Sequence, residues 1–314
     1  MKNKNVLIIG TGNMALEYFK VLKGQGVNCE VIGNSTKTSR RFERLANFKV
    51  MPFKIDEYKD FSRFSHCIIT TSSDSLYKVA RHSLQYGARE ILLEKPGSLF
   101  LSQLKKLNLL SKEKKANVHI AYNRRFYSSV ERLLKLIKQE GGISSFSFDF
   151  SEVEKLVLKE IKNPKILNNW SFVNSTHVID LAFFIASPPK IIRSQKQRTL
   201  NWHPKGSIYV GSGNTIKGEL FSYHANWDSG GRWGLEFHTK KSKYILKPLE
   251  ELRRQKRGEF TTEIIEINDR FDRLYKPGLY KQVDSFLKSR FDKMPSLQAH
   301  IINTEEIYSK ILKL

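Results

Sequence analysis

A short apolar strand that runs directly into a glycine-rich turn and a helix is the feature that most constrains this fold. Residues 5–10 form a nearly unbroken apolar run that ends in Gly10-Thr11-Gly12-Asn13-Met14-Ala15. Such runs are typical of strands buried on both faces of a parallel sheet. A helical pattern over residues 14–23 and a second strand at 29–33 complete a βαβ unit. The sequence therefore predicts a Rossmann domain that binds a dinucleotide.

Each residue of the turn has a physical role in that prediction. Gly10 permits the tight turn, Gly12 lets the backbone approach a pyrophosphate, and Ala15 allows close packing of helix and strand. The phosphate charge is stabilised by the helix N-terminus. The alternative is a purely structural glycine turn. The turn residues expected to contact the cofactor are Gly10, Thr11, Gly12, Asn13 and Met14.

The end of the second strand discriminates between NAD and NADP. An acidic residue there would bind the ribose 2′-hydroxyl of NAD and repel a 2′-phosphate. This chain has Gly33-Asn34-Ser35-Thr36-Lys37 instead, followed by Arg40 and Arg41. We expect Asn34, Ser35, Thr36 and Arg40 to bind the cofactor. NADP is favoured and NAD stays open, because the basic residues could also begin a solvated helix.

The remaining pattern predicts an α/β protein with two domains. Strands at 66–70, 90–93 and 117–121 alternate with helices at 75–86 and 99–114, which indicates a doubly wound parallel sheet. After residue 123 a helix at 129–139 precedes strands at 143–150, 190–200, 206–211, 214–226, 233–239 and 242–247. Two helices, 278–289 and 297–312, complete an α+β domain with an open, largely antiparallel sheet. We expect a Rossmann domain at 1–122 and a substrate and oligomerisation domain at 123–314, whose last helix packs back on the first domain.

Composition narrows the class of protein. The 314 residues are 40% hydrophobic, and no apolar stretch approaches the roughly 20 residues that a membrane span needs. We therefore expect a soluble, cytoplasmic protein without a membrane partner. Cys29 and Cys67 both stand in apolar strand-like runs, which favours buried free thiols over a disulfide or a zinc site. No metal is expected.

A net charge of +23 attracts nucleic acid, anionic membranes or phosphorylated metabolites. Basic clusters stand at 112–115, 240–243 and 253–257, without zinc-finger spacing or an aromatic RNA-binding signature. We expect mostly solvated faces, and a nucleic-acid partner is not favoured. A basic anion-binding protein, acting on nucleic acid or membrane, remains one alternative function.

Glu94-Lys95-Pro96 ends the strand at 90–93, at the sheet edge where open α/β folds bind ligands. A lysine there can act electrostatically or as a proton donor. The alternative is an ordinary surface lysine. The segment makes Lys95 a candidate catalytic residue.

Five segments together resemble the glucose-fructose oxidoreductase and inositol dehydrogenase family, also called Gfo/Idh/MocA. They are Gly10 to Ala15, Thr71-Ser72-Ser73-Asp74-Ser75-Leu76-Tyr77, Glu94-Lys95-Pro96, Ala121-Tyr122-Asn123-Arg124-Arg125-Phe126 and Ser175-Thr176-His177-Val178-Ile179-Asp180-Leu181. The resemblance covers nearly the whole chain. It implies NAD(P)-linked hydride transfer at a sugar or cyclitol carbon and homo-oligomer contacts through the C-terminal sheet.

The resemblance also implies roles for single residues. Lys95 lies near the reacting hydroxyl, and His177 serves with it in acid–base work, the alternative for His177 being a core histidine. Val173 stands where many members have an aspartate, so the proton relay is incomplete. A noncatalytic dinucleotide or sugar-nucleotide sensor is therefore a further alternative. Further cofactor contacts are expected from Thr71, Ser72, Tyr77, Glu94 and Pro96, together with Lys95.

Candidate substrate residues follow the last Rossmann strand and the later aromatic segments. Asn123 and Arg124 stand where the domains should meet, and Arg124 could hold a phosphate or carboxylate or form an interdomain salt bridge. Asn169, Trp170 and Asn226 could line a sugar site, although a core tryptophan is equally consistent. The basic surface favours a phosphorylated or nucleotide-linked sugar, and the segment from Asn168 to Asp180 resembles homologues from surface-polysaccharide pathways.

Overall fold

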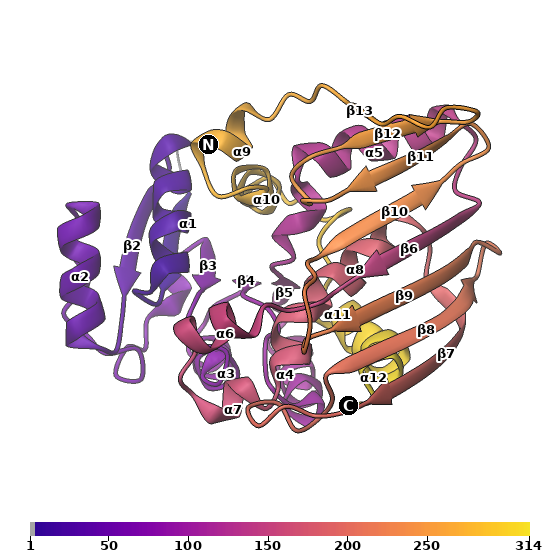
Figure 1. Cartoon of the computed structure of the whole chain (residues 1–314). Coiled ribbons are helices and arrows are strands. Elements are labelled where there is room, and N and C mark those ends of the chain that lie inside the picture. The colour runs from indigo at the N-terminus through magenta and orange to yellow at the C-terminus, as the bar shows by residue number, and fades with distance from the viewer. Residues whose placement is uncertain (1–3) are drawn as a thin grey trace. The chain divides into compact units, whose positions relative to one another are not determined.

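The computed structural model describes residues 4–314, and the chain divides into two compact units (Figure 1). One unit extends to Asn123 and takes in Phe271–Ile301, and the other comprises Arg124–Arg270 and Ile302–Leu314. Each unit is built around its own sheet. The domain ranges expected from the sequence stay a prediction. The chain leaves the first unit after Asn123 and returns to it near the C-terminus.

The first unit contains a five-stranded parallel sheet in the order β2-β1-β3-β4-β5. Its strands are nearly all buried, as their apolar sequences predict. They are β1 (Asn5–Ile9), β2 (Asn28–Ile32), β3 (His66–Ile69), β4 (Glu90–Leu93) and β5 (Asn117–Ile120). Its helices include α1 (Asn13–Gly24), α2 (Thr36–Ala46), α3 (Leu76–Gln85), α4 (Leu101–Glu113) and α10 (Leu279–Leu287).

The strand order creates a switch point between β1 and β3. From β1 the chain passes through α1 to β2 on one side, whereas β3, β4 and β5 follow one another on the other side. Right-handed crossovers therefore place α1 on one face and α3 and α4 on the other. Ligands of open α/β sheets bind at the carboxyl ends of the strands that flank such a point. Here those ends lead into Gly10 and Thr70.

The returning segment completes the first unit. Helix α10 contacts α1, and Phe286 of α10 packs edge-on against His66 of β3 at 5.0 Å. Past α10, Phe291 stacks on His119 at 4.0 Å, and the Pro295 carbonyl accepts a hydrogen bond from the Ile120 amide at 2.9 Å. Helix α11 (Leu297–Asn303) follows. The last helix, α12 (Ser309–Leu312), instead contacts β7 and β8 of the second sheet.

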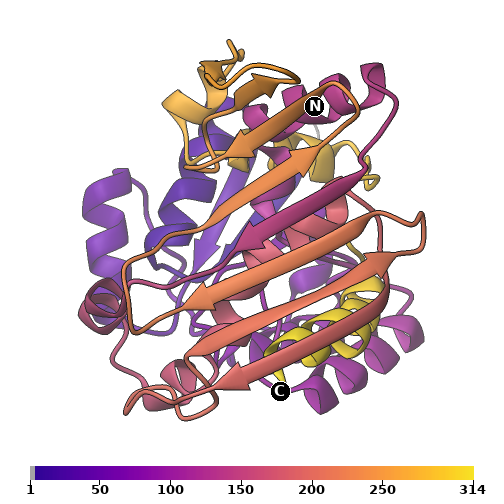
Figure 2. The same ribbon diagram turned by 45° about the vertical axis from the view of Figure 1, so that its right-hand side comes forward.

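The second unit contains an eight-stranded sheet in the order β13-β12-β11-β10-β6-β9-β8-β7 (Figure 2). All neighbours are antiparallel except β6 and β9. The fold class expected from the sequence is thus confirmed. The strands are β6 (Ser145–Asp149), β7 (Pro189–Gln197), β8 (Ile208–Thr215), β9 (Leu220–Asn226), β10 (Gly234–His238), β11 (Ser242–Leu246), β12 (Arg253–Lys256) and β13 (Glu263–Ile264).

Helices cover one face of this sheet. α8 (Thr176–Ile185) contacts β6 and β10, and α12 lies behind β7 and β8 in Figure 2. Phe146 and Phe221 stack between the strands, and Phe183 of α8 meets both rings edge-on. Further helices are α5 (Ser128–Gln139), α6 (Glu154–Glu160), α7 (Pro164–Leu167) and α9 (Arg270–Leu274). Across residues 4–314, none of the helices is long and apolar enough to cross a bilayer.

Two details of the second sheet differ from the sequence expectation. The expected break between strands near residue 212 is wrong, because β8 continues through Gly211 and Gly213 and the turn follows Thr215. An added Cβ would lie 2.4 Å from the Arg193 carbonyl at Gly211 and 1.9 Å from the Ile191 carbonyl at Gly213. These glycines permit close backbone approach within a strand instead of marking a turn. β12 and β13 were not expected, because their charged sequences lack an apolar alternation.

Cys29 and Cys67 are both buried free thiols, as expected. Burial raises the pKa of Cys67 to about 12. Burial also raises the pKa of Cys29 to about 11, against the opposing charge of Lys23.

Candidate functional site

The turn between β1 and α1 requires glycine at its first position. Gly10 has φ of +124°, and a Cβ there would lie 2.7 Å from Thr70 Oγ1. Gly12, the N-cap of α1, is different, because a Cβ there would meet nothing within 4 Å. Open space thus faces the start of a 12-residue helix. The N–H groups of such a helix start can bind phosphate oxygens.

Side chains of α2 fix this turn. Thr11 Oγ1 lies 2.8 Å from Thr38 Oγ1, and Arg41 donates to Asn13 Oδ1 at 2.8 Å. Gly33 packs closely on the same threonine, since a Cβ there would lie 2.6 Å from Thr11 Cγ2. The end of β2 and the first turn of α2 therefore form one surface with the glycine turn. Met14 is half-buried at the start of α1.

The four residues expected to select the cofactor have different local roles. Asn34 Oδ1 accepts from the Ile55 amide at 2.6 Å, and Ser35 is the N-cap of α2, accepting from the Thr38 amide at 3.4 Å. Thr36 and Arg40 are exposed on α2. The first turn of α2 has no acidic residue, so its partial positive charge is not offset there.

A buried hydroxyl lies just after β3, beyond the carboxyl end of that strand. The buried Thr71 Oγ1 has no hydrogen-bond partner among residues 4–314, and such an atom is costly unless a ligand or water satisfies it. Ser72 Oγ lies 2.6 Å from Ser75 Oγ and so closes the turn into α3. Tyr77 is half-buried in the first turn of α3. These residues fit a ligand at the carboxyl edge.

Glu94 and Pro96 are held by contacts within the first unit. The Glu94 carboxylate accepts a hydrogen bond from Tyr18 Oη at 2.8 Å. Desolvation raises the pKa of Glu94, against the lowering effects of this hydrogen bond and of Lys95. The Pro96 carbonyl lies 3.0 Å from His300 Nε2. Lys95, between these two anchored residues, is partly exposed just past β4.

In the second unit a cavity of about 410 Å³ is lined by aromatic and charged side chains. The Arg124 guanidinium lies 4.7 Å from the Trp233 ring, and Trp170 forms another part of the wall. The buried His177 ring lies 6.1 Å from the same indole. Arg124 and Trp170 thus line one cavity, and His177 lies next to Trp233 of its wall.

A buried ion pair fixes the segment that carries Arg124. Arg125 donates from Nε to Asp180 Oδ2 at 2.7 Å and from Nη2 to Oδ1 at 2.6 Å. Tyr308 Oη adds a third hydrogen bond to this carboxylate at 2.9 Å. Asp180 lies on α8 three residues after His177. The pair therefore links the segment that carries Arg124 to helix α8, which carries His177.

The same cavity contains a buried carboxylate. Glu152, which is 5% exposed, follows β6 and accepts hydrogen bonds from Asn174 Nδ2 at 3.0 Å and Ser175 Oγ at 2.9 Å. Val173, where the family pattern has aspartate, is buried in the preceding helical turn. Glu152 is thus an acidic group in the cavity wall at a different point of the chain.

The other candidate substrate residues take part in local structure. Asn123 donates to the Pro277 carbonyl at 3.0 Å. Asn169 donates to the Lys165 carbonyl at 2.8 Å and accepts from Lys205 Nζ at 2.8 Å. Asn226 Oδ1 accepts from the Asp228 amide at 3.0 Å. The cavity wall does not include these three asparagines, and their roles in substrate binding stay a prediction.

Sequence reasoning did not select several side chains around this cavity. Glu152, Arg232 and Trp233 stand in segments without a recognisable motif. Asp180 did carry a signal, because it belongs to the segment that includes His177. Trp227, which follows Asn226, is 2% exposed and stacks on Trp202 at 5.7 Å, so it is a core residue.

The fold and the glycine turn define a dinucleotide-binding protein of the Rossmann class. Residues 4–122 match the Gfo/Idh/MocA family, described as an oxidoreductase family with an NAD-binding Rossmann fold. Residues 4–122 are thus identified as the NAD-binding Rossmann domain of this oxidoreductase family. No curated protein sequence matches the chain.

Solved structures share the fold over the whole chain. UDP-N-acetylglucosamine 3-dehydrogenase GnnA from Acidithiobacillus ferrooxidans has a TM-score of 0.73 at 13% identity, covering 100% of this chain and 97% of that one. The dehydrogenase MviM from Clostridium difficile has a TM-score of 0.77 at 18% identity, covering 99% of each chain. Levoglucosan dehydrogenase in complex with NADH and levoglucosan has a TM-score of 0.74 at 17% identity, covering 99% and 96%. At these identities the similarity concerns the fold.

Proposed function

We propose that this protein transfers a hydride between the nicotinamide of NADP and a secondary alcohol or ketone of a sugar or nucleotide-sugar. The observation that carries the proposal is Lys95, presented at the carboxyl edge of the Rossmann sheet between the anchored Glu94 and Pro96. A bound nicotinamide supplies the hydride acceptor or donor. The protein's part is to bind, orient and exchange one proton with the substrate oxygen.

We assign the exchange of this proton to Lys95 and His177 together. When the alcohol is oxidised, its carbon loses a hydride and its oxygen loses a proton, and Lys95 accepts that proton. His177, buried beside Trp233, is the second acid–base group. In the reducing direction the same groups return the proton to the oxygen.

The preference for NADP is proposed from the surface after β2. Ser35, Thr36 and Arg40 surround the start of α2, where an 11-residue helix has no acid in its first turn. A 2′-phosphate dianion would be stabilised by the helix dipole and by the basic side chains. Asn34 closes this surface through its hydrogen bond to Ile55.

The cavity of the second unit supports a sugar-like substrate. Indole faces pack against C–H surfaces of sugars, and Trp170 and Trp233 both line this cavity. Arg124 can hold a phosphate or carboxylate by paired hydrogen bonds. Two of the structurally similar proteins act on sugars by their names, UDP-N-acetylglucosamine 3-dehydrogenase and levoglucosan dehydrogenase.

The experiment measures cofactor binding and turnover separately. Titration calorimetry with NADP and NAD should show tighter binding of NADP, and the Arg40→Ala variant should reduce that difference. Absorbance of the reduced nicotinamide is then followed with a panel of sugars and nucleotide-sugars. Lys95→Met should abolish turnover and keep cofactor binding, whereas Lys78→Met, at an exposed site on α3, should preserve both.

Two results would contradict the proposal. Unchanged turnover in Lys95→Met would show that Lys95 does not exchange the substrate proton. NADP binding without reduction or oxidation by any member of the panel would favour the noncatalytic sensor.

We also propose a homo-oligomer formed through the open face of the eight-stranded sheet. Side chains such as Ser222 and His224 of β9 are exposed on that face, opposite the helices. Light scattering should show a multimer, and Ser222→Arg should shift it toward the monomer. A monomeric protein would contradict this assignment.

A further inference from the structure

Two basic clusters that are separate in the sequence lie side by side at one edge of the second sheet. β11 and β12 pair so that Ser242 faces Lys256, and the Arg257 amide donates to the Lys241 carbonyl at 2.8 Å. The segment 240–243 therefore borders the segment 253–257. The proposed oxidoreductase activity does not use this concentration of positive charge.

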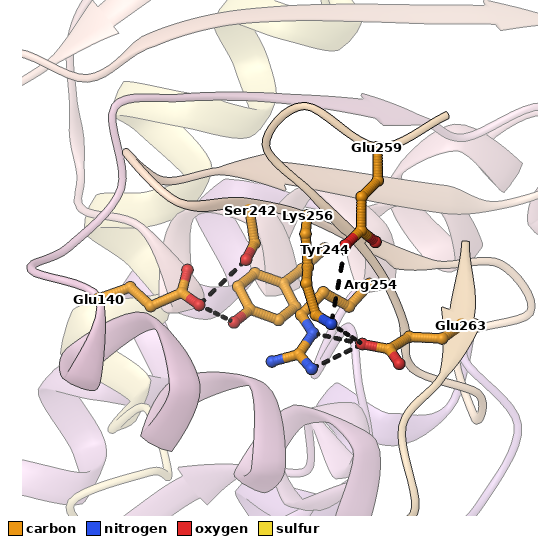
Figure 3. A network of polar contacts seen from close by, with 7 residues as sticks. All are labelled: Glu140, Ser242, Tyr244, Arg254, Lys256, Glu259 and Glu263. Carbon is orange, nitrogen blue, oxygen red and sulfur yellow. Dashed lines mark hydrogen bonds and ion pairs between the residues drawn. The ribbon is translucent and has the colours of Figure 1, made fainter. Parts of the chain in front are cut away.

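Carboxylates neutralise part of this charge and fix the hairpin formed by β12 and β13 (Figure 3). Arg254 donates to Glu263 Oε1 from Nε at 2.8 Å and from Nη2 at 2.6 Å. Lys256 Nζ lies 3.8 Å from Glu259 and 4.0 Å from Glu263. The acidic residues on either side of residues 260–262 are thus paired with basic residues.

A third carboxylate anchors β11 in the same network. Glu140, just past α5, accepts hydrogen bonds from Ser242 Oγ at 3.0 Å and Tyr244 Oη at 2.8 Å (Figure 3). Thr239 Oγ1 donates to the other Glu140 oxygen at 2.6 Å. Both strands of the basic edge therefore have fixed positions.

Three cations are left without a carboxylate. Within the described part of the chain, Lys240, Lys241 and Arg257 enter no ion pair, and all three are exposed. Lys240 and Arg257 line a hollow of about 480 Å³. This hollow also includes Lys243, which is 3.5 Å from Glu236. The local excess of positive charge would attract an anionic surface.

A large apolar side chain projects from the same hairpin. Phe260, three residues after Arg257, is 99% exposed, and Ile264 of β13 is 63% exposed. Exposing a phenylalanine to this extent forgoes the free energy of its burial. An apolar side chain next to a basic patch fits a partner with a charged surface and an apolar interior.

We propose that the basic edge, defined by Lys240, Lys241, Arg257 and Phe260, docks this protein on an anionic lipid bilayer. The cations would contact the headgroups, while Phe260 enters the boundary between headgroups and acyl chains. A single projecting aromatic favours a bilayer over a single-stranded nucleic acid, which is bound by successive stacking rings. This proposal departs from the sequence expectations of solvated basic faces and of no membrane partner, and it is independent of the catalytic assignment.

The test is cosedimentation of the full chain with phosphatidylcholine vesicles that contain about a third phosphatidylglycerol. Each basic residue near an anionic bilayer raises partitioning about fivefold, so Lys240→Gln/Lys241→Gln/Arg257→Gln should lower it about 100-fold. Phe260→Ser should lower it about tenfold. Raising the salt from about 0.1 M to about 1 M shortens the Debye length from about 10 Å to about 3 Å and should release the protein.

Matched controls are available on α4 and just beyond it. Lys106→Gln/Lys112→Gln/Lys115→Gln removes the same charge, and Leu109→Ser removes an apolar side chain that is 68% exposed. Both control variants should bind vesicles as the native protein does. Thermal melts check that each variant is folded.

Several results would overturn the proposal. These are absence of vesicle binding by the native protein, equal losses in the control and basic-edge triple variants, or no effect of Phe260→Ser. Binding to single-stranded DNA but not to vesicles would assign the edge to nucleic acid. An oligomer that Phe260→Ser dissociates, with vesicle binding unchanged, would assign the phenylalanine to self-association.

Discussion

Removing one partner of the buried Arg125–Asp180 pair should destabilise the second unit strongly. Asp180→Asn keeps the shape of the side chain but removes its charge, leaving a guanidinium in a site where Asp180 itself is 1% exposed. Breaking a buried pair in this way costs about 3–5 kcal/mol. Two short hydrogen bonds from Arg125 and a third from Tyr308 place Asp180→Asn near the middle of this range. Tyr308→Phe, which loses one bond to a charged group, should cost about 1.5–3 kcal/mol.

Intrinsic fluorescence can measure this effect in the second unit alone. The chain has four tryptophans, and all of them, Trp170, Trp202, Trp227 and Trp233, lie between residues 124 and 270. With a urea dependence of about 2 kcal/mol per molar, a loss of about 4 kcal/mol moves the midpoint by about 2 M.

A double variant tests the physical reason for this loss. Arg125→Met/Asp180→Leu removes both charges together, and it should recover to within about 1 kcal/mol of the native stability. The reasoning is refuted if Asp180→Asn costs less than about 1 kcal/mol. It is also refuted if the double variant loses the sum of its two single changes, because the cost would then not come from an unpaired buried charge.

Three further predictions use the first unit and the network around Glu140. Gly10→Ala should lower the melting temperature, because its Cβ would lie 2.7 Å from Thr70 Oγ1. Gly12→Ala, where a Cβ meets nothing within 4 Å, should keep the melting temperature and weaken NADP binding in calorimetry. Equal losses of melting temperature in the two variants would contradict this distinction. Burial raises the pKa of Glu140, but hydrogen bonds from Thr239, Tyr244 and Ser242 together lower it by more, so the folded pKa lies below the ordinary value of 4.5. This stabilisation is present above pH 4.5 and lost as the pH falls through the folded pKa. Acid titration of stability should therefore be steeper in the native protein than in Glu140→Gln, and identical slopes would exclude the effect. Cys29 and Cys67, whose pKa values burial raises to about 11 and about 12, should react with a thiol reagent at pH 8 only after unfolding; rapid reaction of the folded chain would show that the thiols are accessible.

Local sequence patterns determined most of what could be predicted. The apolar runs of β1 to β5 and the glycine turn can be recognised in the sequence, because burial on both faces and tight turns restrict residue type at adjacent positions. β12 could not be found in this way. Its residues Arg253–Lys256 form a strand because they pair with β11, and that pairing depends on the placement of the whole sheet.

The side chains that line the cavity of the second unit could likewise be predicted only in part. Arg124 was selected because it follows a recognisable strand, but Glu152 and Trp233 reach the same wall from distant segments. Contacts between residues far apart in the chain leave no periodic signal at either position. Asp180 was visible within a family segment, although only the structure shows that it binds Arg125.

The return of Phe271–Ile301 to the first unit has a consequence for synthesis of the chain. β5 is made early, yet the carbonyl that accepts from its Ile120 amide belongs to Pro295, and the ring on its His119 belongs to Phe291. On the ribosome the first unit therefore cannot complete its fold until the second unit is almost entirely translated. Until then the β5 edge of its sheet and the face of α1 that packs on α10 stay uncovered. A nascent chain halted between these events would carry exposed apolar surface for chaperones to bind, and the N-terminal half of this protein could not finish folding before Phe271–Ile301 is made.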